Sequence, residues 1–398
     1  MPLRDTLAIA TMVGQVATTV ARERFGPAVK LDRPDAVPPN AETVTTDWLT
    51  QALCRAVPGA AVTSIDIIGG SDGTSSRRAL LVGYNDAGRD AGLPTHLFSK
   101  AAAGLFSRLL LGLTDIAEGE SLFYNQVRNS LDLRSPRSYY AGFDPRTRRS
   151  LVILEDLSVD GWSFPDPQHN KVTRADAEDM VAEMARYHGA LWNSPRFATD
   201  LSALKHAERW QQDLDRRVGF RSRTLRGFDR ASAVLPERLV ARRNELYPAF
   251  HRALALHHDT PSTLLHQDLH LGNWLRDPAG RMGLYDWQCV ARGNWALDYA
   301  YALAGALEPE DRREWEEDLL RGYLARLAAE GVTTAPDFDS AWLAYRQQPM
   351  HAFAFGLFTL GGSRFEPELQ PRDYTLAAIG RIARFVDDHT TLDALEAR

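Results

Sequence analysis

The segment from Leu264 to Trp274 reads LLHQDLHLGNW, which sets two histidines, an aspartate and an asparagine, besides a glutamine, into an otherwise apolar stretch. A buried polar or charged group is costly unless partners compensate it, so the fold must supply partners for this segment. Thirteen residues after Asn273 comes a further acid, Asp286, in GLYDWQ. Two kinds of site fit this pattern, a metal site and the catalytic loop of a phosphotransferase. The side chains in question are His266, Asp268, His270 and Asn273.

The two kinds of site use these residues differently. A metal site would take His266, Asp268 and His270, which share one face of a strand at period two. A phosphotransferase loop would use the D-x-x-x-x-N pattern, in which Asp268 accepts the proton of the substrate hydroxyl and Asn273 binds magnesium. Asp286 would be the second metal ligand, because oxygen ligands suit Mg²⁺. In that interpretation His266 braces the loop and His270 has no assigned role.

Composition limits the class of protein. A chain of 398 residues exceeds one typical domain, so two lobes or domains are expected. The formal net charge of -6 argues against nucleic acid as a partner. Two cysteines, Cys54 and Cys289, form no CxxC pair, which argues against a thiolate zinc site and a disulfide scaffold. We therefore expect a cytoplasmic protein.

The N-terminal region divides into a helix and a linker. The stretch Thr6–Ala21 is too short and too polar to span a membrane, which takes about 20 mostly apolar residues. It predicts a helix that packs on the body of the protein or on another subunit, so a homodimer is compatible with it. The proline-rich stretch Lys30–Trp48 predicts a linker, and we place residues 1–45 outside the first lobe.

A β-rich region precedes a helical one. Residues 46–156 combine strand patterns with one helix, and residues 157–398 are mostly helical apart from short strand-like pieces. On the third strand, His96, Phe98 and Lys100 lie on one face at period two. The fold class is therefore α+β, with a small antiparallel sheet lobe, a larger helical lobe and a cleft between them. The predicted strands cover residues 62–70, 77–84, 95–102 and 150–156, and the helix covers residues 114–131.

One glutamate lies on the apolar side of that helix. Glu120 shares a stripe with Ile116, Phe123 and Val127. A carboxylate there needs either an edge position that reaches water or a partner. Lys100, at the end of the preceding strand, is the candidate partner. A strand lysine paired with a helix glutamate is the arrangement that protein kinases use around nucleotide phosphates, so we predict this ion pair.

A glycine-rich turn joins the first two predicted strands. The sequence GGSDGTSS can bring backbone N–H groups close to a phosphate, because glycine has no Cβ. The plainer interpretation is a hairpin loop. The turn matches neither a Walker A loop nor a Rossmann GxGxxG motif. If it binds a nucleotide, the contacts come from Gly70, Ser71, Gly73 and Thr74.

Several motifs resemble a known family. HQDLHLGNW, YDWQ, LDYAYAL and YHGALW are similar to those of the aminoglycoside-phosphotransferase-like kinases, which include choline kinases, macrolide phosphotransferases and ecdysteroid-kinase-like proteins. EGESLFYNQV and LVILEDL are most similar to the ecdysteroid-kinase-like branch. The resemblance covers roughly residues 46–360. It implies a bilobal protein-kinase-like fold with ATP and Mg²⁺ as cofactors.

The resemblance also implies roles for single residues. Asp268 is the catalytic base, and Asn273 and Asp286 are the magnesium ligands. Lys100 holds the phosphates and Glu120 fixes its position.

The resemblance assigns two further places. Glu155, Asp156 and Leu157 fall on the hinge, whose backbone would bind adenine. Asp298 in LDYAYAL is similar to an aspartate that braces the catalytic loop. The glycine turn departs from the family loop, which puts its individual phosphate contacts in doubt.

The acceptor is expected to be a small molecule that carries a hydroxyl group. Only twelve residues separate Asp286 from Asp298, and a protein kinase needs a longer activation segment there. We expect neither nucleic acid nor a membrane as partner. Three alternatives stay open: an inactive nucleotide-binding scaffold of the same fold, the His/Asp metallohydrolase introduced above, and transfer of AMP in place of phosphate.

Overall fold

The computed structural model describes residues 3–27, 29–31, 33, 35–165, 171–363 and 369–396, and divides the chain into two compact units. The first, called the N-terminal unit, comprises Met1–Ser130 and Pro136–Gly161. The second, called the C-terminal unit, comprises Leu131–Ser135 and Trp162–Arg398. The domain limits expected from the sequence, at residues 45/46 and 156/157, stay predictions.

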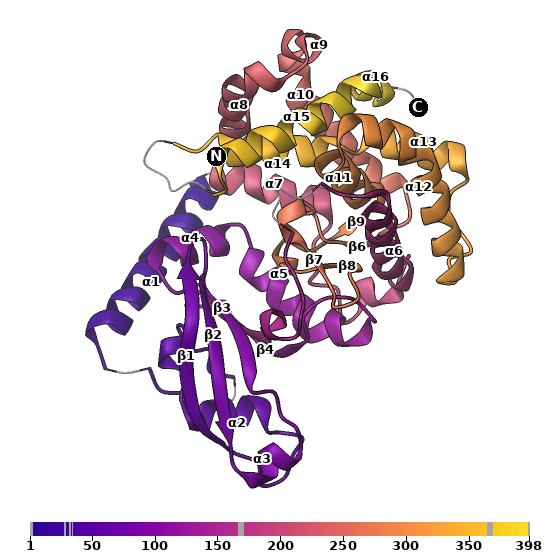
Figure 1. The fold of residues 1–398 in the computed structure, drawn as a ribbon. Helices are drawn as coiled ribbons and strands as arrows, with labels where there is room; N and C mark the ends of the chain where they lie inside the picture. The colour runs from indigo at the N-terminus through magenta and orange to yellow at the C-terminus, as the bar shows by residue number, and fades with distance from the viewer. Residues whose placement is uncertain are drawn as a thin grey trace. The chain divides into compact units, whose positions relative to one another are not determined.

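The described part of the N-terminal unit is built around a five-stranded antiparallel sheet in the order β1-β2-β3-β5-β4 (Figure 1). Four of its strands coincide with the predicted ones, and β4 is an addition. The strands are β1 (Val62–Asp72), β2 (Ser76–Tyr84), β3 (His96–Ala101), β4 (Ser138–Asp144) and β5 (Arg149–Glu155). The helices are α1 (Leu3–Phe25), α2 (Thr46–Leu53), α3 (Asp86–Asp90), α4 (Leu105–Leu113) and α5 (Ile116–Leu122).

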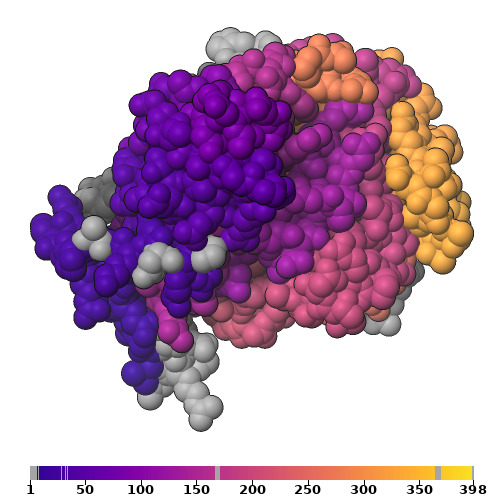
Figure 2. Space-filling view, turned by 90° about the horizontal axis from the view of Figure 1, so that it is seen from below, coloured from indigo at the N-terminus to yellow at the C-terminus, as the bar shows by residue number. Residues whose placement is uncertain are grey.

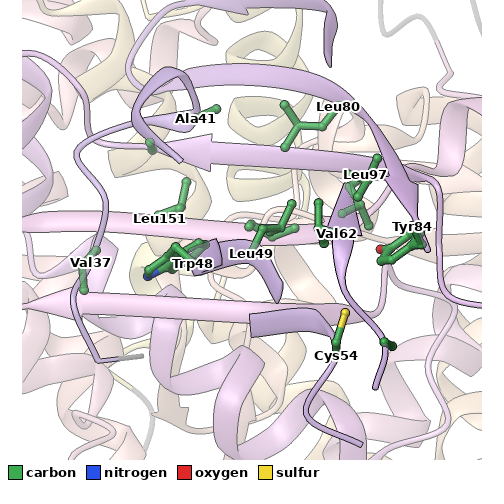
Figure 3. Packing of buried hydrophobic residues seen from close by; sticks show 14 residues of the cluster. Val37, Ala41, Trp48, Leu49, Cys54, Val62, Leu80, Tyr84, Leu97 and Leu151 are labelled. Carbon is green, nitrogen blue, oxygen red and sulfur yellow. The ribbon is translucent and has the colours of Figure 1, made fainter. Parts of the chain in front are cut away.

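One face of the sheet is covered by α2 and by the segment that precedes it (Figure 3). Trp48 of α2 is 1% exposed and belongs to the same apolar cluster as Leu80 and Leu97 of the central strands. Val37 and Ala41 also join this cluster. The proline-rich segment predicted as a linker is thus packed onto the sheet over part of its length.

The alternation along β3 follows the prediction. Leu97 and Ala101 belong to the cluster on the α2 side of the sheet. A strand turns successive side chains to opposite faces, so His96, Phe98 and Lys100 lie on the other face. Helix α5 packs against the neighbouring strands β4 and β5. The predicted helix over residues 114–131 is confirmed, with a π-helical turn at Phe123–Val127 and a 3₁₀ turn at Arg128–Ser130 after α5.

Helix α1 lies against α4 (Figure 1), and the indigo atoms of the chain's N-terminal part are on the surface (Figure 2). The Glu23 carboxylate accepts hydrogen bonds from Arg108 at 2.6 and 2.9 Å and from Arg149 at 2.7 Å. Burial opposes ionisation of Glu23, but the two guanidinium groups outweigh it and hold the pKa of this carboxyl below its ordinary value. The prediction of a helix packed on the body of the protein is confirmed. Among the helices that the structure describes, none is long and apolar enough to cross a membrane.

The described part of the C-terminal unit is mostly helical. Two short antiparallel pairs, β6–β9 and β7–β8, interrupt the helices, and α6 packs against β6, β8 and α12 (Figure 1). The predicted α+β class, with a small antiparallel sheet before a larger helical part, is confirmed. The strands are β6 (Thr263–Leu265), β7 (Trp274–Arg276), β8 (Met282–Leu284) and β9 (Ala291–Gly293). The helices are α6 (Arg174–Ala190), α7 (Ala207–Val218), α8 (Phe220–Ala231), α9 (Glu237–Ala241), α10 (Arg243–Ala255), α11 (Ala296–Ala306), α12 (Pro309–Ala329), α13 (Phe338–Gln347), α14 (Met350–Leu360), α15 (Arg372–Asp388) and α16 (Thr391–Ala394).

Candidate functional site

The predicted ion pair between β3 and α5 is present. Lys100 Nζ donates a hydrogen bond to Glu120 Oε1 at 2.9 Å, and both side chains are only 7% exposed. Desolvation of two charges costs free energy that their attraction only partly returns, so a buried pair is weak evidence for stability. Its position on β3 and on α5, the second helix after that strand, resembles the arrangement of the lysine–glutamate pair in protein kinases.

The strand register shows where the other residues predicted to bind the nucleotide lie in this unit. Arg77 of β2 lies opposite Lys100, so the β1–β2 turn and Lys100 lie at the same end of the sheet. Leu97 lies opposite Glu155, which places the predicted hinge three residues away along β3. At about 3.3 Å per residue, the two places are roughly 10 Å apart. Leu157, just beyond Glu155, is buried.

The glycine turn forms the hairpin that its plainer interpretation predicts. Ser71 is part of β1, and Gly73 and Thr74 form the turn itself. Gly70 has a φ of +154°, and a Cβ at this position would lie 2.3 Å from the carbonyl oxygen of Arg77. Gly70 is therefore required by the close approach of β1 to β2. The phosphate contacts expected of these residues stay predictions.

In the C-terminal unit, a buried carboxylate fixes the loop that follows β6. The backbone N–H groups of His266 and Gln267 donate to Asp298 Oδ2 and Oδ1 at 2.7 and 2.9 Å. Asp298 also accepts a hydrogen bond from Tyr187 at 2.8 Å, and His188 Nε2 lies 3.6 Å from it. The bracing role that the family resemblance implies for Asp298 is confirmed. His188, on the apolar stripe of α6, is a buried support for this carboxylate.

The charge state of Asp298 follows from these partners. Burial alone would raise its pKa, but the nearby His188 ring and the backbone N–H of His266 lower the pKa below its ordinary value. The carboxylate is thus ionised and can accept both N–H groups of the loop. Gln267 is held with a φ of +64°, a backbone conformation that costs a non-glycine residue about 1–3 kcal/mol.

His266 uses both ring nitrogens within the loop. Its Nδ1 accepts the backbone N–H of Asp268 at 3.3 Å, and its Nε2 donates to the carbonyl oxygen of Tyr285 at 3.0 Å. The bracing role predicted for His266 is confirmed. The structure favours this role over the alternative metal site at His266, Asp268 and His270, which are not among the described side chains whose ligand atoms lie close enough to hold a metal ion.

The side chains of the D-x-x-x-x-N pattern meet directly. Asn273 Nδ2 donates to the backbone oxygen of Asp268 at 2.8 Å and to its Oδ2 at 3.2 Å. The hydroxyl of Tyr301 donates to Asp268 Oδ1 at 3.4 Å. The Asp268 side chain is 20% exposed, so it can still reach a substrate.

The β7–β8 hairpin brings Asp286 to the same region. Trp274 lies opposite Leu284, and the Tyr285 N–H donates to the carbonyl oxygen of Asn273 at 3.1 Å. Asp286 follows at once, with a φ of +62°. The amide nitrogen of Asn273 is used as a donor, so its Oδ1 is the atom that a cation would take. An amide oxygen and a carboxylate at one end of a hairpin fit the oxygen ligands that Mg²⁺ prefers.

Two contacts of this loop were not predicted from the sequence. Tyr301 lies one helical turn after Asp298 in α11, so the LDYAYAL motif contained a signal for it. His270 was left without a role, whereas its Nδ1 accepts the backbone N–H of Gly272 at 3.1 Å and its Nε2 lies 3.1 Å from the Gln370 amide nitrogen. Gln370 is a hundred residues away, and no local pattern points to it.

Residues 152–336 match the model of a family described as the phosphotransferase enzyme family. The predicted resemblance to aminoglycoside-phosphotransferase-like enzymes is confirmed, and the match supports a phosphotransferase. The narrower similarity to ecdysteroid kinases stays a prediction. No curated protein matches the chain significantly.

Solved structures of similar proteins include kinases of small molecules. Choline kinase LicA from Streptococcus pneumoniae is 14% identical over 82% of this chain and 94% of its own, with a TM-score of 0.43. Aminoglycoside phosphotransferase APH(3'')-Id from Streptomyces rimosus, solved with ADP and streptomycin, is 17% identical over 80% and 98% of the two chains, with a TM-score of 0.42. An aminoglycoside phosphotransferase solved with GDP and kanamycin is 16% identical over 87% and 99%, with a TM-score of 0.47.

Proposed function

We propose, from the match of residues 152–336 to a phosphotransferase family, that this protein transfers the γ-phosphate of ATP to a hydroxyl group of a small molecule. The observation that carries the proposal is the contact between Asn273 and Asp268. Asp298 fixes their loop by accepting two of its backbone N–H groups. A base and a metal-ligand amide at this spacing are the parts that kinases need.

Asp268 is the proposed base. It would orient the acceptor hydroxyl and take its proton, while Asn273 and Tyr301 hold the carboxylate in place. General base assistance of this kind contributes typically about 10²–10⁴-fold to a rate. The rest of the rate would come from positioning and from charge neutralisation, since little covalent chemistry falls to the protein in phosphoryl transfer.

Asn273 and Asp286 are the proposed magnesium ligands, through an amide oxygen and a carboxylate. When bound, Mg²⁺ would supply positive charge that neutralises the charge on the phosphates. Lys100 would hold the phosphates from the N-terminal unit, and Glu120 keeps its ammonium in place. The hinge at Glu155, Asp156 and Leu157 would hold the adenine, and Gly70, Ser71, Gly73 and Thr74 would lie over the phosphates.

The acceptor is proposed to be small. The chain between Asp286 and Asp298 is taken up by a 3₁₀ turn at Trp287–Cys289, by β9, which pairs with β6, and by the start of α11. No peptide-binding segment of the protein-kinase type fits into this length. A compact acceptor with a hydroxyl group agrees with this short length.

Release of ADP is the test. The full chain is assayed with ATP and Mg²⁺ against hydroxylated metabolites, sterols, sugars and antibiotics in a coupled ADP-release assay. We expect acceptor-dependent ADP release, and Asp268→Ala should lose roughly 10²–10⁴-fold in turnover while still binding nucleotide. The matched control is Asp200→Ala, which removes an exposed aspartate that pairs with Arg196.

Other outcomes identify the alternatives. Nucleotide binding without acceptor-dependent ADP release from any compound would point to the inactive scaffold. Release of pyrophosphate in place of ADP would point to AMP transfer. Undiminished turnover in Asp268→Ala would remove that residue from the role of base.

A further inference from the structure

A second group of metal-ligating side chains lies at the beginning of α7. His206 precedes the helix and Glu208 is in its first turn, while His258 comes from the 3₁₀ turn Leu256–Asp259 that leads into β6. Each residue offers one ligand atom, and these atoms all lie within 4.8 Å of one another. Within the described residues this is the group of three His, Cys, Asp or Glu side chains close enough to hold a metal ion.

The three side chains are already arranged around a common point. His258 Nε2 lies 2.5 Å from Glu208 Oε2, and the rings of His206 and His258 are stacked with centroids 4.5 Å apart. Two stacked imidazoles do not readily both carry a positive charge. The pKa of His206 is lowered by burial and by the positive charges of His258 and Arg292, against the opposing effects of Glu208 and the His257 carbonyl. A neutral imidazole is the form that binds metals.

A second observation points to a ligand. Nδ1 of His206 is buried and makes no hydrogen bond of normal geometry with any residue that the structure describes. A buried polar atom nearly always has a hydrogen-bond partner. Where the protein supplies none, a bound water or ion commonly takes that place. The Nδ1 atom of His206 is therefore a candidate ligand atom for a water or an ion.

We propose that His206, Glu208 and His258 form a binding site for a zinc-class divalent transition metal ion. Two imidazoles and one carboxylate are a frequent zinc ligand set, with water in the fourth position. At zinc–ligand bonds of about 2.0–2.1 Å, tetrahedral ligand atoms lie roughly 3.3 Å apart. The ligand atoms here lie within 4.8 Å of one another, so side-chain shifts of about an ångström bring them to that separation. Mg²⁺ is disfavoured here, since it prefers oxygen ligands.

The site would be distinct from the magnesium ligands of the proposed phosphotransferase. It joins the beginning of α7 to the turn from which the chain enters β6, and β6 ends directly before His266. His206 also forms a backbone bridge with Arg292 of β9, the partner strand of β6. A bound ion would thus fix the base of the β6–β9 pair that holds the catalytic loop. The guanidinium of Arg292 opposes a cation, so Glu208 has to supply the compensating charge.

Cobalt and zinc binding test the site in the full-length protein. The chain is stripped with a chelator, and Co²⁺ is titrated in while the visible absorption that reports its coordination is recorded. Zn²⁺ binding is measured by calorimetry and by its effect on the melting temperature. We expect one ion per chain, displacement of Co²⁺ by Zn²⁺, and a higher melting temperature with zinc.

Variants decide whether these three residues are the ligands. His258→Ala and Glu208→Gln should each weaken zinc binding by more than the roughly 10–100-fold that loss of an outer-shell partner costs. His251→Ala is the matched control, because His251 is half-exposed, pairs with Asp215 and lies outside the group. Glu208→Gln keeps the size of the side chain, so it answers the question even if His258→Ala fails to fold. Equal binding in wild type and in Glu208→Gln, or no saturable binding at all, would overturn the proposal, and neither result touches the phosphotransferase test.

Discussion

At the scale of single residues, the buried carboxylate of Asp298 fixes the shape of the loop that carries Asp268. It accepts two consecutive backbone N–H groups, from His266 and Gln267, and thereby holds Gln267 in its left-handed conformation. A charged acceptor makes such hydrogen bonds roughly twice as strong as neutral ones. The chemistry proposed for Asp268, one residue further on, therefore depends on a side chain that is fully buried.

The change Asp298→Asn tests this dependence. An amide keeps the size of the side chain but offers one acceptor oxygen, so one loop N–H loses its partner. We expect a loss of about 1–3 kcal/mol in the free energy of unfolding and a fall in turnover larger than any change in the KM for ATP. Denaturant unfolding and steady-state kinetics measure these. Asp200→Asn, at an exposed position, should change neither.

The proposed role of Asp286 is to bind magnesium together with Asn273. Asp286→Ala removes one of the two proposed ligands, so nucleotide affinity measured with Mg²⁺ should fall toward the affinity measured without it. Calorimetry with ATP in the presence and absence of magnesium makes the comparison. If the wild type and the variant gain equally from magnesium, Asp286 is not a ligand.

At the scale of elements, β3 and the helix that begins with α5 act as one unit through Lys100 and Glu120. Both side chains come from the faces that their elements turn toward each other, and both are nearly buried. Removal of one member of a buried pair leaves an uncompensated charge, which costs more than removal of both.

A double-mutant cycle separates these two costs. Lys100→Met and Glu120→Gln should each destabilise the protein by about 3–5 kcal/mol, and the double variant should recover much of that loss. Phosphate affinity should not recover, because the proposed function needs the ammonium itself. Denaturant unfolding and ATP binding are measured on all four proteins. A double variant as unstable as the sum of the two single variants would mean that the pair does not act as a unit.

The elements also show how far a sequence can predict this molecule. Lys100 and Glu120 could be found because each sits in a regular pattern, alternation in a strand and a stripe in a helix, and Glu120 breaks its stripe. The loop residues Asp268 and Asn273 could be found because their spacing is local. Strand β4 was missed because its buried residues do not alternate along the strand, although it pairs with β5 across a short hairpin. The contacts of His270 with Gln370 and of His206 with His258 join distant segments and leave no periodic trace.

At the scale of the whole molecule, the helical unit buries several neutral imidazoles. Burial lowers the pKa of His257 to about 3 and the pKa of His351 to about 4. Each ring makes a hydrogen bond that the neutral form supports, His257 with Gln348 at 3.0 Å and His351 with the Gln267 carbonyl at 2.9 Å. His351 therefore links the loop that carries Asp268 to α14. The folded protein resists protonation at these rings, whereas the unfolded chain does not.

Mild acid should therefore destabilise the protein in a defined window. An unfolded histidine takes up its proton near pH 6.5, and folded His351 does so only near pH 4, so the unfolded state binds more protons between these values. Stability falls as the pH drops through this window, by roughly 2 kcal/mol per buried histidine at about pH 5. His351→Asn removes one such group, so its loss of unfolding free energy between about pH 7.5 and about pH 5 should be smaller than that of the wild type by that amount. Denaturant unfolding at the two pH values, with a chelator present to keep metal ions out of the comparison, measures the difference. An identical loss in the two proteins would show that His351 takes up its proton at the same pH in the folded and unfolded chains.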